Sequence, residues 1–269
     1  MKRRGTVVKA LAARRRHPLA GVVLLMLGLM VTGTAYAVAA PEQAEAAQIA
    51  PGDPEQGKEL FLANCSTCHG TGGQGASAGP SLIGVGAASF DFQVGTGRMP
   101  LAATAPQAPQ NDVKFSDQDV ADLAAYGATL GPGPAIPTAE EVEALAEDER
   151  IEEGNELFRV NCAMCHNVVG SGGALTRGKY APALEGVSEK HTYEAMVTGP
   201  QSMPVFNDAN ITTEEKQSII SYLKYVEEQP PPGGLALGSL GPVTEGLFAW
   251  IGMLGIIIAC TIWLGAKSS

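Results

Sequence analysis

The sequence predicts a mainly α-helical protein with two small tandem domains of one design, a C-terminal transmembrane helix and an N-terminal signal or anchor helix. Three observations support this prediction. The segments Gly57–Asn64 and Gly154–Asn161 share Gly, Glu, Leu, Phe and Asn at a constant offset of 97 residues, which is the size of a small domain. Strand patterns are weak, while Ala, Gly and Glu are abundant. Apolar runs lie near both ends of the 269-residue chain.

Each repeat carries a Cys-x-x-Cys-His motif directly after the shared segment. The motif residues are Cys65, Cys68 and His69 in the first copy and Cys162, Cys165 and His166 in the second. This spacing is the attachment pattern of c-type haem, in which two thiols form thioethers with the porphyrin and the histidine binds the iron. Four of the five cysteines and two of the four histidines fall into the pattern, which argues against chance pairs. We therefore expect two covalently bound haem c groups.

Methionines downstream of each motif are the candidates for the second axial ligand. Met99 precedes a proline after the first motif, and Met203 precedes a proline at the matching place after the second. A thioether is a soft, neutral ligand that raises the reduction potential of haem iron. We expect Met99 to bind the iron of haem 1 and Met203 to bind the iron of haem 2.

Other side chains of the second repeat compete for roles at its haem. Met196 lies in a helical context and is expected in the core, whereas His191 would give bis-histidine ligation, lower the potential and break the parallel between the repeats. Met164 lies between the two tethering cysteines and cannot reach the far face of the haem. The loop after the motif adds Arg177 and Lys179, which either pair with haem propionates or are simply exposed.

Capping signals predict where the helices of the first repeat lie. Asp53 followed by Pro54 indicates a helix that runs to the first haem motif. Gly57 lies on the packed face of this helix, so a second helix is expected to cross closely at that point. Ser116 is the expected cap of that second helix. Residues 102–115, rich in Ala, Pro and Gln, have no counterpart in the second repeat and are expected to form a surface insertion.

The second repeat shows the same kinds of signal. Thr138 fits a capping box at the start of a strongly acidic helix, Glu140–Glu153, that leads toward the second haem motif. Thr212–Glu227 is the expected closing helix of this repeat. The domain boundaries follow: leader and signal or anchor 1–40, first haem domain 41–130, Pro/Gly linker 131–137, second haem domain 138–229, tether 230–246 and transmembrane helix 247–264.

The charge distribution indicates export and a membrane attachment. Residues 1–40 contain seven basic and no acidic residues, leaving 11 basic and 28 acidic residues in the remainder, a net charge of −17. A basic leader before an apolar run is typical of an export signal, whether cleaved or retained. The run Leu247–Leu264 has no charged residue and carries Trp250 and Trp263 near its ends, as membrane-spanning helices do. Bulk negative charge excludes nucleic acid as a partner.

These elements resemble, in order and over nearly the whole chain, the dihaem cytochrome c subunit of the actinobacterial-type cytochrome bcc complex, a menaquinol:cytochrome c reductase. The resemblance implies two class I cytochrome c domains anchored in the cell membrane, with the haem domains on the outer face. It also implies a cytochrome b subunit, a Rieske iron–sulfur subunit and a haem–copper oxidase as partners, with membrane lipid around the anchor. The chain would then be the electron-transfer subunit of an enzyme complex, with no substrate site of its own.

The function expected from these observations is electron transfer from the Rieske centre of a quinol:cytochrome c reductase to a terminal haem–copper oxidase. Iron with both axial positions filled leaves no place for a substrate, so the protein contributes ligands, dielectric and position while the cofactor does the redox step. Two alternatives remain at this stage. One is an electron-transfer subunit of another membrane dehydrogenase or oxidase, and the other is a dihaem peroxidase-like enzyme.

Overall fold

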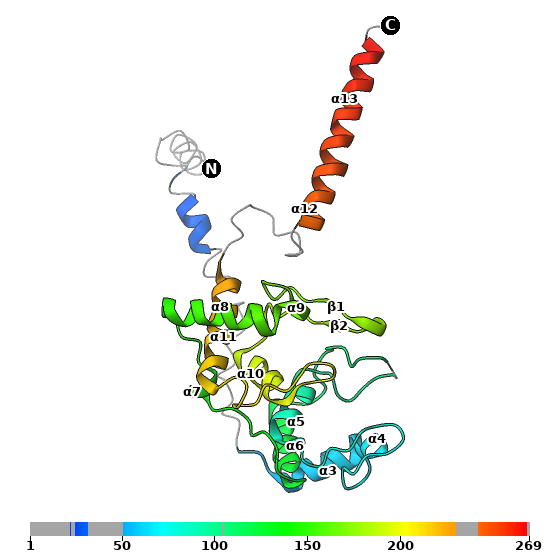
Figure 1. Cartoon of the computed structure of the whole chain (residues 1–269), viewed down its shortest axis with the longest axis vertical. Coiled ribbons are helices and arrows are strands. Elements are labelled where there is room, and N and C mark those ends of the chain that lie inside the picture. The colour runs from blue at the N-terminus through cyan, green and yellow to red at the C-terminus, as the bar shows by residue number, and fades with distance from the viewer. Residues whose placement is uncertain (1–21, 23–24, 32–50, 104, 230–241, 268–269) are drawn as a thin grey trace, which may run out of the picture. The chain divides into compact units, whose positions relative to one another are not determined.

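The computed structural model describes residues 22, 25–31, 51–103, 105–229 and 242–267 (Figure 1). Most of the expected leader and tether therefore lies outside the described residues. The described part of the chain after residue 50 is mainly helical. Its elements are α3 Pro54–Asn64, α4 Ser66–His69, α5 Ala87–Gly95, α6 Asp117–Thr129, α7 Ala139–Val142, α8 Asp148–Asn161, α9 Ala163–His166, β1 Gly173–Ala174, η1 Thr176–Gly178, β2 Tyr180–Ala181, α10 Glu189–Thr198, α11 Thr213–Glu228, α12 Pro242–Phe248, the π-helical turn η3 Ala249–Met253 and α13 Leu254–Lys267.

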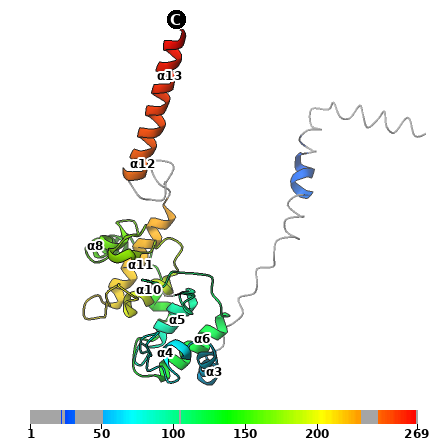
Figure 2. The same cartoon turned by 90° about the vertical axis from the view of Figure 1, so that its right-hand side faces the viewer.

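In each haem domain, the helix before the Cys-x-x-Cys-His motif crosses the closing helix at a glycine. α3 packs on α6, and α8 packs on α11 (Figure 2). A Cβ atom on Gly57 would lie 1.9 Å from the carbonyl oxygen of Asp122, and one on Gly154 would lie 1.8 Å from that of Ser218. No side chain fits there, because real Cβ contacts begin above 3 Å. The close crossing predicted from Gly57 is confirmed, and Gly154 repeats it.

An aromatic pair fixes each crossing on the core side. The rings of Phe61 and Tyr126 lie 5.2 Å apart in the first domain, and those of Phe158 and Tyr222 lie 5.6 Å apart in the second. Such tilted pairs add to the stabilisation that comes from burial alone. Phe61 and Phe158 are essentially inaccessible to solvent, so each helix ends with its haem motif held against a rigid core.

The capping signals are found where the sequence placed them. The Asp53 side chain accepts a hydrogen bond from the backbone amide of Glu55, and Pro54 lies in the first turn of α3. Capping boxes begin at Ser116, Thr138 and Thr212, before α6, α7 and α11. Each box satisfies backbone amides that a helix start leaves without intrahelical partners. These local signals therefore determine where the helices begin.

The prediction of one continuous acidic helix over Glu140–Glu153 is wrong, because the segment forms two helices. The chain forms α7, leaves the helix at Glu143 with ψ of 123°, and re-enters as α8 at Asp148. In between, Ala144 packs against the second core, and the amide of Leu145 donates to the Ser221 hydroxyl at 2.8 Å. Contacts to α11 thus replace the helical hydrogen bonds that this segment would have made.

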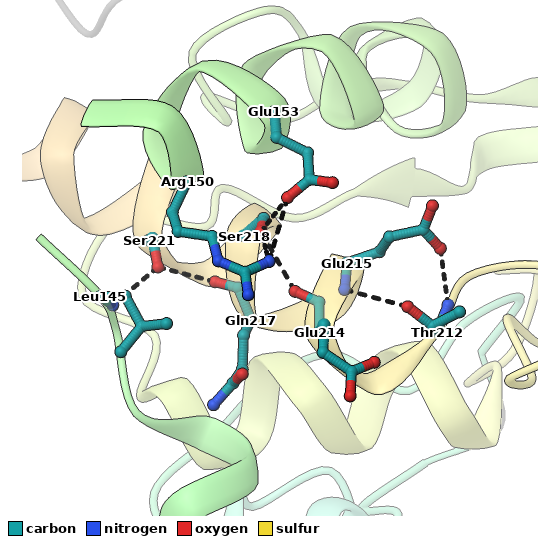
Figure 3. A network of polar contacts seen from close by, with 9 residues as sticks. All are labelled: Leu145, Arg150, Glu153, Thr212, Glu214, Glu215, Gln217, Ser218 and Ser221. Atoms are coloured by element: carbon teal, nitrogen blue, oxygen red, sulfur yellow. Dashed lines mark hydrogen bonds and ion pairs between the residues drawn. The ribbon is translucent and has the colours of Figure 1, made fainter. Parts of the chain in front are cut away.

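Figure 3 shows the polar network around the crossing of α8 and α11. The Ser218 hydroxyl donates to Glu153 Oε2 at 2.7 Å, and Arg150 forms an ion pair with the same oxygen at 3.2 Å. The ion pair is partly exposed, so it adds little stability alone. Ser218 also supplies the backbone carbonyl that lies against Gly154. Polar side chains therefore surround the point where the two helices touch through their backbones.

The C-terminal helix begins earlier than predicted. Helical structure starts at Pro242 rather than at residue 247 and continues to Lys267. Among the described residues, Val243–Ala266 is the one helix long and apolar enough to cross a membrane, with 24 residues and none of its most apolar window buried. At about 1.5 Å per residue this length exceeds the hydrocarbon core of a bilayer.

Candidate functional site

The two haem motifs adopt the same local structure. Each begins at the last turn of a long helix and continues into a four-residue helix, α4 or α9 (Figure 1). The amide of His69 donates to the Cys65 carbonyl at 3.0 Å, and that of His166 donates to Cys162 at 2.9 Å. One helical turn therefore separates the first thiol from the histidine, which places both on one side of the chain.

A backbone carbonyl orients each motif histidine. Nδ1 of His69 lies 2.8 Å from the carbonyl oxygen of Pro80, and Nδ1 of His166 lies 3.0 Å from that of Pro182. A carbonyl only accepts, so the hydrogen sits on Nδ1 and the lone pair on Nε2. Histidines that bind metals are held in this way, with the second nitrogen donating to a carbonyl or carboxylate. Both rings are thus prepared to bind iron through Nε2.

The loops that follow the two motif histidines differ in sequence but form the same pattern of backbone hydrogen bonds. The amide of Gly75 donates to His69 and that of Leu82 to Gly73, while Gly172 donates to His166 and Leu184 to Gly170. Gly73, Gly75, Gly170 and Gly172 all have positive φ, a conformation that glycine adopts without strain. Glycine at these four positions therefore allows both loops to form the same turns next to the motif histidine.

A cavity in the second domain brings the predicted haem residues together. It is lined by Cys162, Cys165, His166 and Met203, with Phe158, Leu184, Ile219 and Leu223 among the apolar walls. The cavity opens to solvent, and its lining is mainly apolar with a few polar side chains, as is usual for cofactor sites. Met203 therefore faces the same space as the two thiols and the histidine, as axial ligation requires.

The rivals of Met203 occupy other positions around this cavity. Met196 lines it from α10 but is buried in the second core, as expected. His191 also lines it, yet its Nε2 lies 3.8 Å from Asp91 Oδ2 and its ring meets the Phe92 ring edge-on. Met164 is 92% exposed and points into solvent. In the first domain, Met99 is half-buried against the core that contains Phe61.

The first domain supplies part of the wall of the second domain's cavity. Phe92 and Arg98 line it from α5 and the loop that follows, and Gln107 and Gln110 line it from the segment 102–115. The Arg98 guanidinium lies 4.8 Å from the centre of the Phe92 ring. No sequence pattern predicts this contribution, because the two repeats read as independent domains. Arg177 and Lys179, which the sequence suggested as possible partners of haem propionates, are not among the residues that line the cavity.

Most of the described residues of the segment 102–115 are exposed, and the segment also makes specific contacts with the second domain. Gln107 makes two hydrogen bonds of 2.9 Å with the backbone of Tyr180. The Gln201 side chain makes two of 3.0 Å with the backbone of Ala108. Paired donor and acceptor contacts of this kind fix a chain segment in one register. The segment fastens the first domain across the mouth of the second domain's cavity.

Burial shifts the pKa of three motif side chains, Cys65, Cys162 and His166. Burial, with a smaller effect of the neighbouring thiol, raises the pKa of Cys65 and of Cys162 to about 11. Burial lowers the pKa of His166, while its bond to Pro182 acts in the opposite direction. A neutral imidazole is the form that binds metal. The chemistry of the donor set thus fits haem c: paired thiols, an oriented neutral imidazole and a thioether around one largely apolar space.

Comparisons with known proteins agree with this geometry. The family described as cytochrome c matches residues 54–130, and the family described as cytochrome c oxidase, cbb3-type, subunit III matches residues 149–223. The cytochrome bc1 complex cytochrome c subunit of Corynebacterium efficiens is 40% identical over 94% of this chain and 90% of its own length. Its namesake in Mycobacterium bovis is 41% identical over 95% of this chain and 93% of its own length.

The chain belongs to the family of cytochrome bc1 complex cytochrome c subunits. Family membership confirms the resemblance drawn from the sequence, and the two family matches confirm the cytochrome c fold of both domains. As a cytochrome c, the chain is an electron carrier and a component of an oxidoreductase. The two cytochrome c domains imply haem c, and the structure gives the Cys-x-x-Cys-His motifs of both domains the same local geometry. A less similar relative, the cbb3-type cytochrome c oxidase subunit FixP of Azorhizobium caulinodans, is 28% identical over 44% of this chain and 39% of its own length.

Proposed function

We propose that this chain carries electrons from the Rieske iron–sulfur centre of a quinol:cytochrome c reductase to a terminal haem–copper oxidase. One haem c would be held by Cys65, Cys68, His69 and Met99, and a second by Cys162, Cys165, His166 and Met203. The observation that carries the proposal is the cavity whose lining unites two thiols, an imidazole and a thioether. A full set of axial ligands suits a carrier and leaves no position for a substrate.

Haem c, when bound, supplies one-electron redox chemistry. The chain's own residues supply the rest. Pro80 and Pro182 keep the histidine Nε2 atoms available, and the apolar walls around the second site exclude water, which lowers the local dielectric. Arg98, at the cavity wall, provides a positive charge near the second site. The contacts of Gln107 with Tyr180 hold the two domains in register, so the separation between the two sites stays constant.

The proposed partners follow from the family and from the attachment of the domains. In this proposal the chain stands beside a cytochrome b subunit and a Rieske subunit on the outer face of the cell membrane, anchored in lipid by Val243–Ala266. The body's excess of acidic residues favours partner surfaces that are positively charged. A tethered carrier also works at high effective concentration, so it replaces a diffusing cytochrome.

The test is purification in detergent through a tag on this chain. We expect two covalently bound haems per chain and co-purification of cytochrome b, the Rieske protein and a haem–copper oxidase. Washed membranes should reduce the oxidase at full rate with quinol and no added soluble cytochrome. The double variant Cys162→Ser, Cys165→Ser should stay in the membrane but stop oxidase reduction.

Specific results would contradict the proposal. Fewer than two covalent haems, or strict dependence of oxidase reduction on an added soluble carrier, would overturn it. Co-purification with a different dehydrogenase would assign the chain to another electron route. A shift of the reduced spectrum with carbon monoxide would indicate an exchangeable iron position and so a peroxidase-like enzyme.

A further inference from the structure

Three side chains meet at the contact between the two domains, outside the predicted haem ligand sets. Asp91 lies on α5 of the first domain. His191 and Glu194 lie on α10 of the second domain, and their spacing of three residues places them on one helix face. Their ligand atoms all lie within 4.8 Å of one another. We call these three residues the interdomain cluster.

The buried carboxyl group of Glu194 has no partner that accounts for it. The residue is 0% exposed, and neither carboxyl oxygen has a hydrogen-bond partner among the described residues. The polar group facing it is the Asp91 carboxylate, which is itself buried. Two acceptors cannot satisfy each other without a proton or a cation between them. Buried carboxylates in proteins are paired or bind metal, because an isolated one is strongly disfavoured.

We propose that the interdomain cluster is a binding site for one divalent transition-metal ion of the zinc class, held by Asp91, His191 and Glu194. One imidazole and two carboxylates are ligands that zinc accepts, and three protein ligands leave a fourth position for water. The imidazole disfavours calcium and magnesium, which take oxygen ligands. The site goes beyond the electron-carrier function and does not depend on it.

The charges around the cluster allow such an ion to enter. Lys190 Nζ lies 2.5 Å from Asp91 Oδ2 and neutralises it, but the Lys190 side chain is 42% exposed and long enough to turn into solvent. An ion of charge +2 would then balance the carboxylates of Asp91 and Glu194. Burial and the pairing with Asp91 raise the pKa of Glu194 to about 9, so the ion displaces a proton. Burial and the charge of Lys190, with a smaller effect of Arg98, lower the pKa of His191 and outweigh the opposing effect of Asp91, which keeps the imidazole neutral for ligation.

An ion at this position would join the two domains directly. α5 also carries Phe92, and α10 also carries Met196, and both side chains line the cavity of the second domain. Metal ligands from α5 and α10 would therefore fix the wall of that cavity as well as the domain contact. The consequence is a clamp on the relative position of the two haem domains.

The experiment is calorimetric titration of the haem-loaded, EDTA-treated full chain in detergent with zinc chloride. We expect one zinc ion per chain, with affinity that rises between pH 6 and pH 8, because Glu194 must lose its proton. The titratable and charged groups near Glu194 are Asp91, Lys190 and His191. Glu194→Gln removes a ligand but mimics the protonated side chain, so it should fold and keep its haem spectra. Its zinc affinity should fall at least 10- to 100-fold.

Two further variants complete the design. His191→Gln should weaken zinc binding to a similar extent, and X-ray absorption of the zinc-loaded protein should show a nitrogen and oxygen shell. Glu185→Gln, an exposed residue of the same domain, should bind zinc as the wild type does. The proposal is overturned by absence of stoichiometric zinc binding, which would leave a shared proton on the Asp91–Glu194 pair, or by unchanged affinity in Glu194→Gln. Electron transfer plays no part in the readout, so this test and that of the proposed function fail separately.

Discussion

Replacing Gly154 by alanine tests whether the close crossing of α8 and α11 holds the second haem motif in place. A Cβ atom at this position would lie 1.8 Å from the Ser218 carbonyl oxygen, whereas ordinary contacts begin near 3.4 Å. The helices would have to separate by roughly 1.6 Å to admit it, the difference of these distances. The obstacle is backbone, so no side-chain rotation relieves it.

Two opposing effects decide the size of the loss. Alanine favours the helix over glycine by about 1 kcal/mol, while overpacking of a close contact costs about 1–3 kcal/mol and occasionally more. The rigid obstacle places the cost at the upper end, so we expect a net loss of about 2 kcal/mol. For a domain of this size that lowers the unfolding midpoint by about 10 °C.

The assay is thermal unfolding of the haem-loaded full chain in detergent, followed by far-ultraviolet circular dichroism and haem absorbance. The matched control is Glu152→Ala on the exposed face of the same helix, where we expect a change within about 0.5 kcal/mol. Gly57→Ala should reproduce the effect in the first domain, where the corresponding distance to Asp122 is 1.9 Å. An unfolding midpoint of Gly154→Ala equal to or above that of the wild type would refute the reasoning.

Three other predictions concern the sites. Met203→Leu should remove the sulfur–iron charge-transfer band from one of two haems, whereas Met196→Leu, a volume-conserving core change costing under about 1.5 kcal/mol, should keep both; the reverse pattern would reassign the ligand. Arg98→Gln should lower the potential of the second haem by roughly tens of millivolts, the order expected when a unit positive charge is removed from the wall of the site. The exposed Arg177→Gln should leave this potential unchanged in potentiometric titration. The Glu194 pKa is raised from its ordinary 4.5 to about 9, so the native state holds the proton that the unfolded state loses. Stability in EDTA should therefore fall as pH rises from about 5 to 8, and this slope should be shallower in Glu194→Gln; equal slopes would contradict the assignment.

Much of the local structure was predictable because its causes are local. Asp53, Ser116, Thr138 and Thr212 cap helices through contacts within three residues. The interrupted helix after α7 was missed because its cause is not local: the Leu145 amide bonds to Ser221, 76 residues away. The start of the membrane helix at Pro242 was not predicted, because the first turns contain polar residues and the prediction followed only the uncharged apolar run.

The sequence by itself determined the haem motifs, the helix caps, the repeat and the glycine at each helix crossing, because each depends on chemistry within a few residues or on a repeated pattern. Only the tertiary structure decided that the second domain's cavity is completed by Arg98 and Gln107 of the first. The same holds for the contact of Asp91 with Glu194. These arrangements join residues about a hundred positions apart, and their geometry depends on how two whole domains pack, which no local pattern records.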